Sequence, residues 1–202
     1  MNRTLYSIGY TAFNIEQFLN ILKKYQITSL IDVRSMPYSK HYSDYNKDFL
    51  SKVLKDNKIL YRNYKDEFGA RQANKNFYSN DGYLNFDIFA KSNQFLYGVE
   101  KIIAGLKLNQ NFVFMCAEKD PLECHRSILV GHQFSLRGFN VLHILDYNEI
   151  ISQDEIDKIL VDKYFPNRDQ ISFFDQGNSY YNYIGNAYKK KNLEIGFKAQ
   201  EE

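Results

Sequence analysis

Short apolar runs alternate with amphipathic segments along the first 150 residues of the chain. Apolar runs of strand length occupy residues 5–9, 29–33, 59–61, 111–117 and 140–145. Between them, apolar residues recur at helical spacing, as at Ile15, Phe18, Leu19 and Leu22. Strand–helix alternation of this kind favours a mostly parallel sheet with helices on both faces. The pattern therefore predicts an α/β fold.

Polar residues mark where several of the expected helices begin and end. Asn14 with Gln17, and Ser152 with Glu155, have the spacing of a capping box, in which two side chains bind the free N–H groups of a helix start. Gly138 stands where the helix before the last strand should stop, and glycine is the usual residue at such a stop.

Two parts of the chain depart from this regular pattern. Residues 68–93 mix glycine, asparagine and aromatic residues without a period, and we interpret them as a long excursion that packs over a site. After about residue 150 we expect one helix up to Pro166, then a polar, tyrosine-rich stretch. We divide the chain into an α/β core domain, 1–150, and a helical or extended C-terminal extension, 151–202, packed on the core.

Composition narrows the class of protein. Hydrophobic residues make up 44% and charged residues 25% of the 202 residues, which excludes a disordered or fibrous chain. A net charge of +2 does not by itself predict a nucleic-acid binder. Two cysteines are too few for a disulfide scaffold and indicate a reducing compartment. The sequence shows neither a signal peptide nor an apolar run of about 18 residues, so we expect a cytoplasmic protein without a membrane span.

Chemically capable side chains follow the expected strands. Ligands of parallel sheets usually bind beyond the carboxyl ends of the strands, so these side chains are the candidates for a site. The catalytic candidates are Asp32, Cys116, Glu118, Cys124 and His125. The substrate-binding candidates are Tyr10, Arg34, Ser35, Arg71 and Arg126.

Asp32 and Arg34 stand two residues apart at a strand end, so their side chains point to the same side. An arginine there can bind a carboxylate or phosphate through two parallel hydrogen bonds. The alternative is an Asp–Arg pair that only ties the strand to the next loop.

Both cysteines fall within one segment, residues 116–126. Cys124 stands near an expected helix start and beside Arg126, and both features lower the pKa of a thiol. Cys116 ends a buried strand, where a free cysteine is commonly a small core residue. Either thiol is a candidate nucleophile or redox group, with Asp32, Glu118 or His125 moving protons.

A zinc site is the other use of two cysteines and a histidine. The spacing does not match a paired CxxC knuckle, and adjacent Cys124 and His125 point in different directions on a helix. Four ligands are needed and only three of these are near in sequence. The sequence therefore predicts no metal and no cofactor.

Four motifs occur in order along the chain and resemble those of a known family. They are Ser7–Thr11, Asp32–Pro37, Phe68–Arg71 and Met115–Arg126. Together they are similar to the bacterial and archaeal proteins grouped as domain-of-unknown-function family 488. Residues 163–174 and 187–196 resemble the tail of the longer members. Tyr10 stands where members often carry histidine, and Ala70 where a second glycine is common. The resemblance implies a small cytosolic α/β domain and supplies no reaction.

The residues leave three functions open. The first is an enzyme acting on a small anionic, nucleotide-like or nucleic-acid substrate. The second is a non-catalytic module associated with nucleic acid, because Lys40, His41, Tyr42 and Tyr45, and again 180–191, interleave basic and aromatic residues. The alternative interpretation of those stretches is a solvated face of a tyrosine-rich protein.

The third function is docking on a partner. The segment that contains Gln170, Phe173 and Phe174 resembles the glutamine-led, doubly hydrophobic peptide that docks on the bacterial sliding clamp. Alternatively, these aromatic residues attach the tail to the core of this protein.

Overall fold

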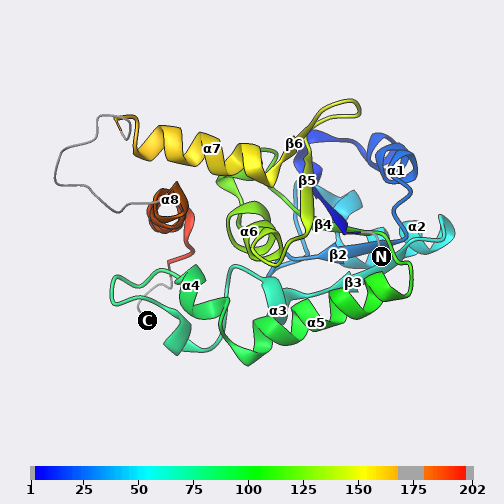
Figure 1. Ribbon diagram of the computed structural model, residues 1–202. Helices are drawn as coiled ribbons and strands as arrows, with labels where there is room; N and C mark the ends of the chain where they lie inside the picture. The colour runs from blue at the N-terminus through cyan, green and yellow to red at the C-terminus, as the bar shows by residue number, and fades with distance from the viewer. Residues whose placement is uncertain (1–2, 168–179, 199–202) are drawn as a thin grey trace.

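The computed structural model describes residues 3–167 and 180–198. Its centre is a six-stranded sheet in the order β3-β2-β4-β1-β5-β6 (Figure 1). The strands are β1 (Thr4–Gly9), β2 (Ser29–Asp32), β3 (Leu60–Asn63), β4 (Phe112–Cys116), β5 (Asn140–Ile144) and β6 (Ile150–Ser152). The first five are parallel and β6 is antiparallel to β5, which confirms the predicted α/β fold with a mostly parallel sheet.

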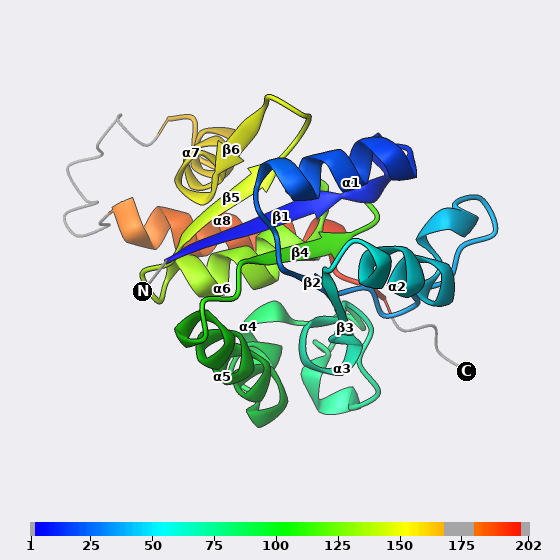
Figure 2. The same cartoon turned by 90° about the vertical axis from the view of Figure 1, so that its right-hand side faces the viewer.

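Helices cover both faces of this sheet. They are α1 (Ile15–Lys24), α2 (Lys47–Asp56), α3 (Lys65–Phe68), α4 (Phe86–Phe89), α5 (Asn93–Lys107), α6 (His132–Ser135), α7 (Gln153–Tyr164) and α8 (Tyr180–Ile195). Figure 2 shows α1 and α2 on one face and α5 and α6 on the other.

Alternation along β4 explains the two layers. Phe112 and Phe114 belong to the apolar cluster that includes residues of α5 and α6. Val113 and Met115 belong to the other apolar cluster, with residues of α1 and α2. Successive side chains of a strand point to opposite faces, so a continuous apolar run supplies both cores.

The predicted helix ends are present. Asn14 with Gln17 and Ser152 with Glu155 each form a complete capping box, at the start of α1 and α7. Gly138 follows α6 with a φ of 77°, a left-handed conformation that glycine adopts without the strain of a side chain.

The segment between β4 and β5 is helical but irregular. A 3₁₀ turn, Pro121–Glu123, leads to a π-helical turn, Arg126–Gly131, which continues into α6. Cys124 and His125 stand between the two turns, so Cys124 does precede a helical segment as the sequence predicts. Single π turns within helices are frequent at functional sites.

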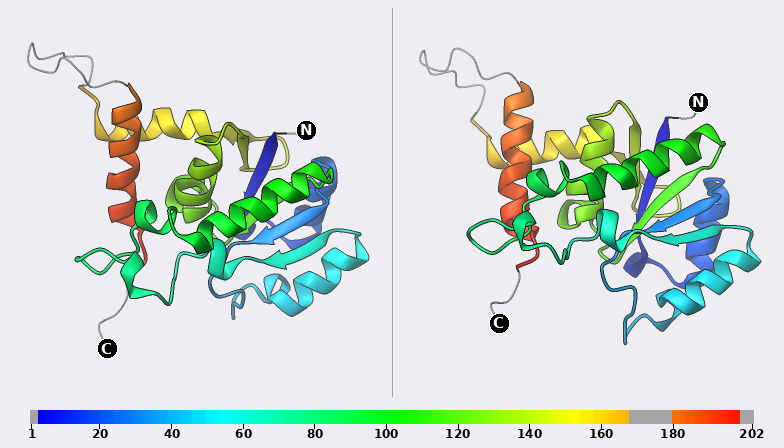
Figure 3. Two further views of the ribbon diagram at one scale, coloured as in Figure 1. Left: turned by 60° about the horizontal axis from the view of Figure 1, so that its bottom comes forward. Right: turned by 90° about the horizontal axis from the view of Figure 1, so that it is seen from below.

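The C-terminal part packs on the core. Strand β6 contains residues on both sides of the predicted boundary at 150/151 and pairs with β5. Helix α8 lies beside α4 (Figure 3). The amide of Asn192 accepts a hydrogen bond of 2.9 Å from the backbone N–H of Phe86, and donates one of 2.9 Å to the carbonyl of Leu84. The 68–93 excursion therefore contacts α8.

One buried cation also attaches α8 to the segment between β4 and β5. Lys191 is 1% exposed, and its Nζ lies 2.6 Å from a carboxylate oxygen of Glu123 and 3.2 Å from one of Glu194. The predicted docking residues Gln170, Phe173 and Phe174 lie outside the described residues. Within the described residues, no helix has the length and apolar character needed to cross a bilayer.

Candidate functional site

The register of the sheet brings three of the sequence motifs to one edge. Gly9, the last residue of β1, is paired with Cys116, the last residue of β4. Asp32, the last residue of β2, is paired with Met115. The carboxyl ends of β1, β2 and β4 therefore meet, where ligands of parallel sheets usually bind.

Four of the predicted catalytic residues gather at this edge. The ligand-type atoms of Cys116, Glu118, Cys124 and His125 all lie within 4.8 Å of one another, and we call these residues the thiol cluster. The Cys124 Sγ lies 2.9 Å from a carboxylate oxygen of Glu118. The His125 Nδ1 lies 3.8 Å from the Cys116 Sγ and 3.9 Å from the Cys124 Sγ. Both cysteines are buried, and Glu118 belongs to an exposed loop.

The His125 ring is oriented by the backbone at the end of β2. Its Nε2 lies 3.1 Å from the carbonyl oxygen of Val33. A carbonyl oxygen only accepts hydrogen bonds, so Nε2 carries a proton and donates it. The other ring nitrogen, Nδ1, therefore faces the two sulfur atoms.

The pKa values of the two thiols are shifted in opposite directions. Burial disfavours ionisation of Cys124, but its contacts with Cys116, Arg126 and His125 prevail and lower the pKa of its thiol. Burial and the neighbouring Cys124 raise the pKa of Cys116. Of the two thiols, Cys124 is therefore the one that ionises more readily.

The proton-moving groups of the cluster are shifted as well. The Glu118 carboxyl loses water where it packs on the cluster, and this raises its pKa. The neighbouring Cys124 raises that pKa further. Burial alone would lower the pKa of His125, but the hydrogen bond with Cys124 and the charges of Cys124 and Glu118 raise it. A thiolate and a carboxylate 2.9 Å apart repel each other, so these two groups share a proton.

Arg126 holds the loop that follows β4. Its Nη1 donates to the carbonyl of Glu118 at 2.6 Å, and its Nη2 donates to the carbonyl of Lys119 at 3.1 Å. Its backbone N–H donates to the Cys124 Sγ at 3.4 Å. The side chain is fully buried, so it places a positive charge next to the thiol cluster. Its predicted contact with a substrate stays a prediction.

Asp32 and Arg34 form a buried pair beside the cluster. The Asp32 carboxylate accepts from the Arg34 Nε at 2.9 Å and Nη2 at 2.6 Å. It also accepts from the Tyr61 hydroxyl at 2.7 Å. The Arg34 Nη2 donates in addition to the carbonyl of Tyr45 at 2.8 Å. The pair thus ties β2 to the following loop, and the roles of Asp32 and Arg34 toward a substrate stay predictions.

Arg34 keeps one donor without a partner. Its Nη1 is buried and makes no hydrogen bond within the described part of the chain. The guanidinium lies over the Tyr10 ring, 5.0 Å from its centre. Burial raises the pKa of Tyr10, Arg34 opposes this, and Cys116 and Glu118 raise it further. Tyr10 is therefore close both to Arg34 and to two members of the thiol cluster.

Ser35 and Arg71 face a different space. The Ser35 Oγ accepts from the backbone N–H of Arg71 at 2.9 Å. Both residues line a cavity of about 350 Å³, together with Met36 and Lys65, and no residue of the thiol cluster lines it. The structure brings these two predicted residues together with each other, and not with the cysteines.

A buried polar chain runs from the sheet to the C-terminal extension and is not predicted by the sequence pattern. The His143 Nδ1 lies 2.6 Å from the Ser7 Oγ, and its Nε2 lies 2.9 Å from the Gln153 Oε1. The Gln153 amide donates to the Tyr188 hydroxyl at 2.7 Å, which donates to Asp157. The only sign of these hydrogen bonds in the sequence is His143, a polar residue in the middle of an apolar strand.

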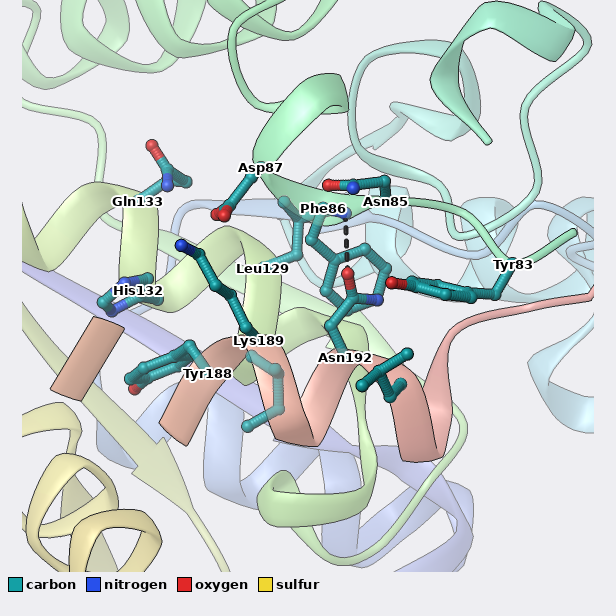
Figure 4. Close-up of a pocket in the computed structure, with 12 residues that line it drawn as sticks. Tyr83, Asn85, Phe86, Asp87, Leu129, His132, Gln133, Tyr188, Lys189 and Asn192 are labelled. Carbon is teal, nitrogen blue, oxygen red and sulfur yellow. Dashed lines mark hydrogen bonds between the residues drawn. The ribbon is translucent and has the colours of Figure 1, made fainter. Parts of the chain in front are cut away.

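A separate cavity of about 160 Å³ lies between α4, α8 and the helical segment before α6 (Figure 4). Asp87 and Lys189 reach into it from opposite walls. The His132 ring stacks on Tyr188 with 3.5 Å between the ring centres, and burial lowers the pKa of His132 to about 4. None of the predicted site residues lines this cavity.

Comparison with known proteins gives one match. A family model described as "Domain of unknown function DUF488" matches residues 14–132, which include the whole thiol cluster. No curated protein and no solved structure matches the chain.

Proposed function

The chain belongs to the DUF488 family, and we propose that it is an enzyme in which Cys124 attacks a phosphate-bearing, nucleotide-like or nucleic-acid substrate. One observation carries the proposal. The Cys124 Sγ lies within reach of the Glu118 carboxylate and the His125 Nδ1, and His125 is itself oriented by Val33. A nucleophile, a base and a group that orients the base form the constellation of nucleophilic catalysis.

Three residues of the thiol cluster have a role in the proposed reaction. The Cys124 thiolate gives an electron pair to an electrophilic atom of the substrate, and the bond from that atom to the leaving group breaks. His125 passes its Nδ1 proton to the leaving group. His125, now without its Nδ1 proton, takes a proton from water, whose oxygen displaces Cys124 and releases the second product, while Glu118 keeps the proton that it shared with Cys124. The net reaction is a hydrolysis.

Two groups support an anionic substrate. The free Nη1 of Arg34 is a donor that a phosphate oxygen could satisfy, and the Tyr10 hydroxyl is a second donor nearby. Arg34 is already paired with one carboxylate, so the site favours an anion held by single contacts over a bidentate one.

Exposed aromatic residues beside Tyr10 support a substrate that carries a base. Tyr38 and Tyr42 are 54% and 41% exposed, and the apolar side chain of Met36, nearby in the sequence, is 63% exposed. Lys40 and His41 lie between them in the sequence, and we call residues 36–42 the aromatic lip. The Tyr42 ring lies 5.5 Å from the Tyr10 ring, which joins the lip to the site. Exposed aromatic rings with lysines are a platform on which bases stack.

Access to Cys124 depends on Glu118. Cys124 is 1% exposed, whereas residues 118–120 are exposed. We propose that the substrate displaces the Glu118 side chain, which frees the thiolate and the base together.

The test is turnover of mononucleotides, dinucleotides and short single-stranded oligonucleotides by three proteins: the unaltered chain, Cys124→Ser and Cys116→Ser. We expect Cys124→Ser to lose at least a hundredfold in rate, because a hydroxyl is a far weaker nucleophile than a thiolate. Cys116→Ser serves as the matched cysteine variant, with far-ultraviolet circular dichroism to confirm the fold of both. Turnover by Cys124→Ser at the unaltered rate would rule out this mechanism.

The aromatic lip and two exposed lysines of α8, Lys189 and Lys190, also favour a second candidate, a non-catalytic module that binds nucleic acid. It predicts binding of single-stranded oligonucleotides that weakens steeply with salt and is reduced in Tyr38→Ala. Such binding would be unaffected by Cys124→Ser, which separates this function from the enzyme.

A further inference from the structure

The thiol cluster has the composition and spacing of a site for a transition metal. It contains two thiol groups, one imidazole and one carboxylate, which are the ligands that proteins use for zinc. We propose that Cys116, Cys124, His125 and Glu118 bind one Zn²⁺ ion, and that this ion caps Cys124. The binding stands by itself, and only the resulting inhibition rests on the proposed enzyme function.

The distances fit a tetrahedral site. With Zn–S bonds of about 2.3 Å and a Zn–N bond of about 2.1 Å, a sulfur and a nitrogen of one tetrahedron lie about 3.6 Å apart. The His125 Nδ1 lies 3.8 Å and 3.9 Å from the two sulfur atoms. An ion at the centre therefore requires only small shifts of three ligands that are already buried.

The His125 ring is oriented as a metal ligand requires. A ligating histidine almost always donates its other N–H to a carboxylate, carbonyl or water, which fixes the tautomer. Here Nε2 donates to the carbonyl of Val33, and Nδ1 faces the sulfur atoms. This hydrogen bond does not depend on the cysteines, because its acceptor, the carbonyl of Val33, lies at the end of β2.

Glu118 is the ligand that must move. Its carboxylate lies 2.9 Å from the Cys124 Sγ, closer than two ligands of one zinc ion, because the two groups share a proton. An ion that replaces this proton moves the carboxylate outward. The backbone of Glu118 is held by Arg126, but the residue is exposed and its side chain can rotate. Sequence spacing alone identifies three ligands, and Glu118 is the fourth.

The surrounding charge also favours the ion. Two thiolates, one carboxylate and Zn²⁺ have a total charge of −1. Arg126 is fully buried next to Cys124 and supplies the compensating charge of +1. Its backbone N–H also donates to the Cys124 Sγ, which stabilises a thiolate. The bound site is therefore neutral as a whole, as a buried site should be.

Zinc would use the same atoms as the proposed reaction. A Cys124 sulfur that is bound to zinc and shielded by three other ligands cannot reach a substrate, so the metal-free chain is the active form. Removal of zinc by a chelator therefore restores the thiolate and the base in one step.

The first experiment measures binding in the whole chain. Native mass spectrometry of the reduced protein with Zn²⁺ should show one bound ion, and Co²⁺ should give the intense visible bands of a tetrahedral site with sulfur-to-cobalt charge transfer. A loss of two hydrogen masses without metal would show a Cys116–Cys124 disulfide instead. That result under reducing conditions, or an octahedral cobalt spectrum, would overturn the proposal.

Variants then assign the ligands. Cys116→Ser, Cys124→Ser and His125→Gln should each weaken zinc binding beyond the 10–100-fold that is typical of a change outside the ligands. His41→Gln, which changes an exposed histidine far from the cluster in sequence, is the matched control and should bind as the unaltered chain does. Equal affinity for the ligand variants and the control would contradict the proposal, even if one ligand variant fails to fold.

The same proteins separate this proposal from the enzyme function. Zinc should protect Cys124 from alkylation by iodoacetamide, and a chelator should restore the reaction. If zinc binds and protects Cys124 while Cys124→Ser retains turnover, the enzyme proposal fails and the metal site stands. If Cys124→Ser loses turnover while zinc neither binds nor protects, the metal site fails and the enzyme proposal stands.

Discussion

Gly9 has no room for a side chain, because a Cβ at that position would lie 1.9 Å from the carbonyl oxygen of Glu118. The same Cβ would lie 3.1 Å from the Cα of Lys119. Both obstacles are backbone atoms, which cannot rotate aside as the end of a long side chain can. The last residue of β1 therefore lets the loop after β4 close over the thiol cluster.

We expect Gly9→Ala to displace that loop and to destabilise the protein by roughly 1–3 kcal/mol, the usual cost of overpacking. The displaced loop should also expose Cys124, so its alkylation by iodoacetamide should become faster. Urea denaturation and labelling kinetics measure the two effects. Slower labelling than in the unaltered chain would contradict the arrangement of Gly9 and Glu118.

Gly185 in α8 provides the matched control. A Cβ there meets nothing within 4 Å. Alanine has a higher helix propensity than glycine, so Gly185→Ala should stabilise the protein by roughly 0.5–1 kcal/mol. It should leave the labelling of Cys124 unchanged, because Gly185 is exposed on another helix.

The Asp32–Arg34 pair should be costly to break. Both side chains are buried, at 0% and 5% exposure, and Asp32 is the partner of both Arg34 and Tyr61. Asp32→Ala leaves a buried guanidinium without its counter-charge, so we expect a loss of about 3–5 kcal/mol in unfolding free energy. The double variant Asp32→Ala/Arg34→Met should recover part of it, and a double variant that is less stable than Asp32→Ala would argue against the pair.

Asp157 should make stability depend on pH. Burial raises the pKa of its carboxyl to about 6, the Tyr188 hydroxyl opposes this, and Asp154 raises it further. The folded state therefore holds a proton that the unfolded chain, with an aspartate pKa of about 4, releases. Its stabilising effect is complete below about pH 4 and is lost as pH rises through about 6.

Asp157→Asn isolates this effect, because the titrations of His132 and His143 occur in both proteins. The difference in unfolding free energy between the two proteins should change by roughly 2–3 kcal/mol between pH 4 and pH 7. This change should favour the Asp157→Asn protein at the higher pH, because the amide carries no charge at this partly buried position. Parallel pH profiles of the two proteins in urea would show that Asp157 does not titrate in this range.

The buried ammonium of Lys191 should contribute little to stability. Its partners Glu123 and Glu194 are 57% and 43% exposed, so water can hydrate them when the lysine is absent. Lys191→Met keeps the volume and removes the cost of burying a charge, so the unfolding free energy should change by less than about 1 kcal/mol. Lys191→Ala, which leaves a cavity, should cost roughly 2–4 kcal/mol. Similar losses for both variants would show that the ion pair itself stabilises α8.

Local patterns were sufficient to predict the five parallel strands, several helix ends and the family. The apolar run at 111–117 became β4, and Asn14 and Ser152 became helix caps, because each depends on neighbouring residues. The cluster of Cys116, Glu118, Cys124 and His125 also comes from one short segment, so the sequence could single out its members.

Contacts between distant segments could not be predicted in the same way. The hydrogen bond from His125 to Val33 joins residues 92 positions apart, and that between Ser7 and His143 joins residues 136 apart. The pairing of Ser35 with Arg71, away from the cysteines, also depends on how the loops pack. Strand β6 was missed because three residues are too few for a recognisable pattern, and only their pairing with β5 makes them a strand.

The strand order has a practical consequence for expression of this protein. The family match spans residues 14–132, which excludes β1 and β5, although β1 lies in the middle of the sheet between β4 and β5. A fragment cut to the matched residues would leave β4, whose five residues are all buried, as an apolar edge with unpaired backbone groups. Such edges pair with other chains, so that fragment should aggregate.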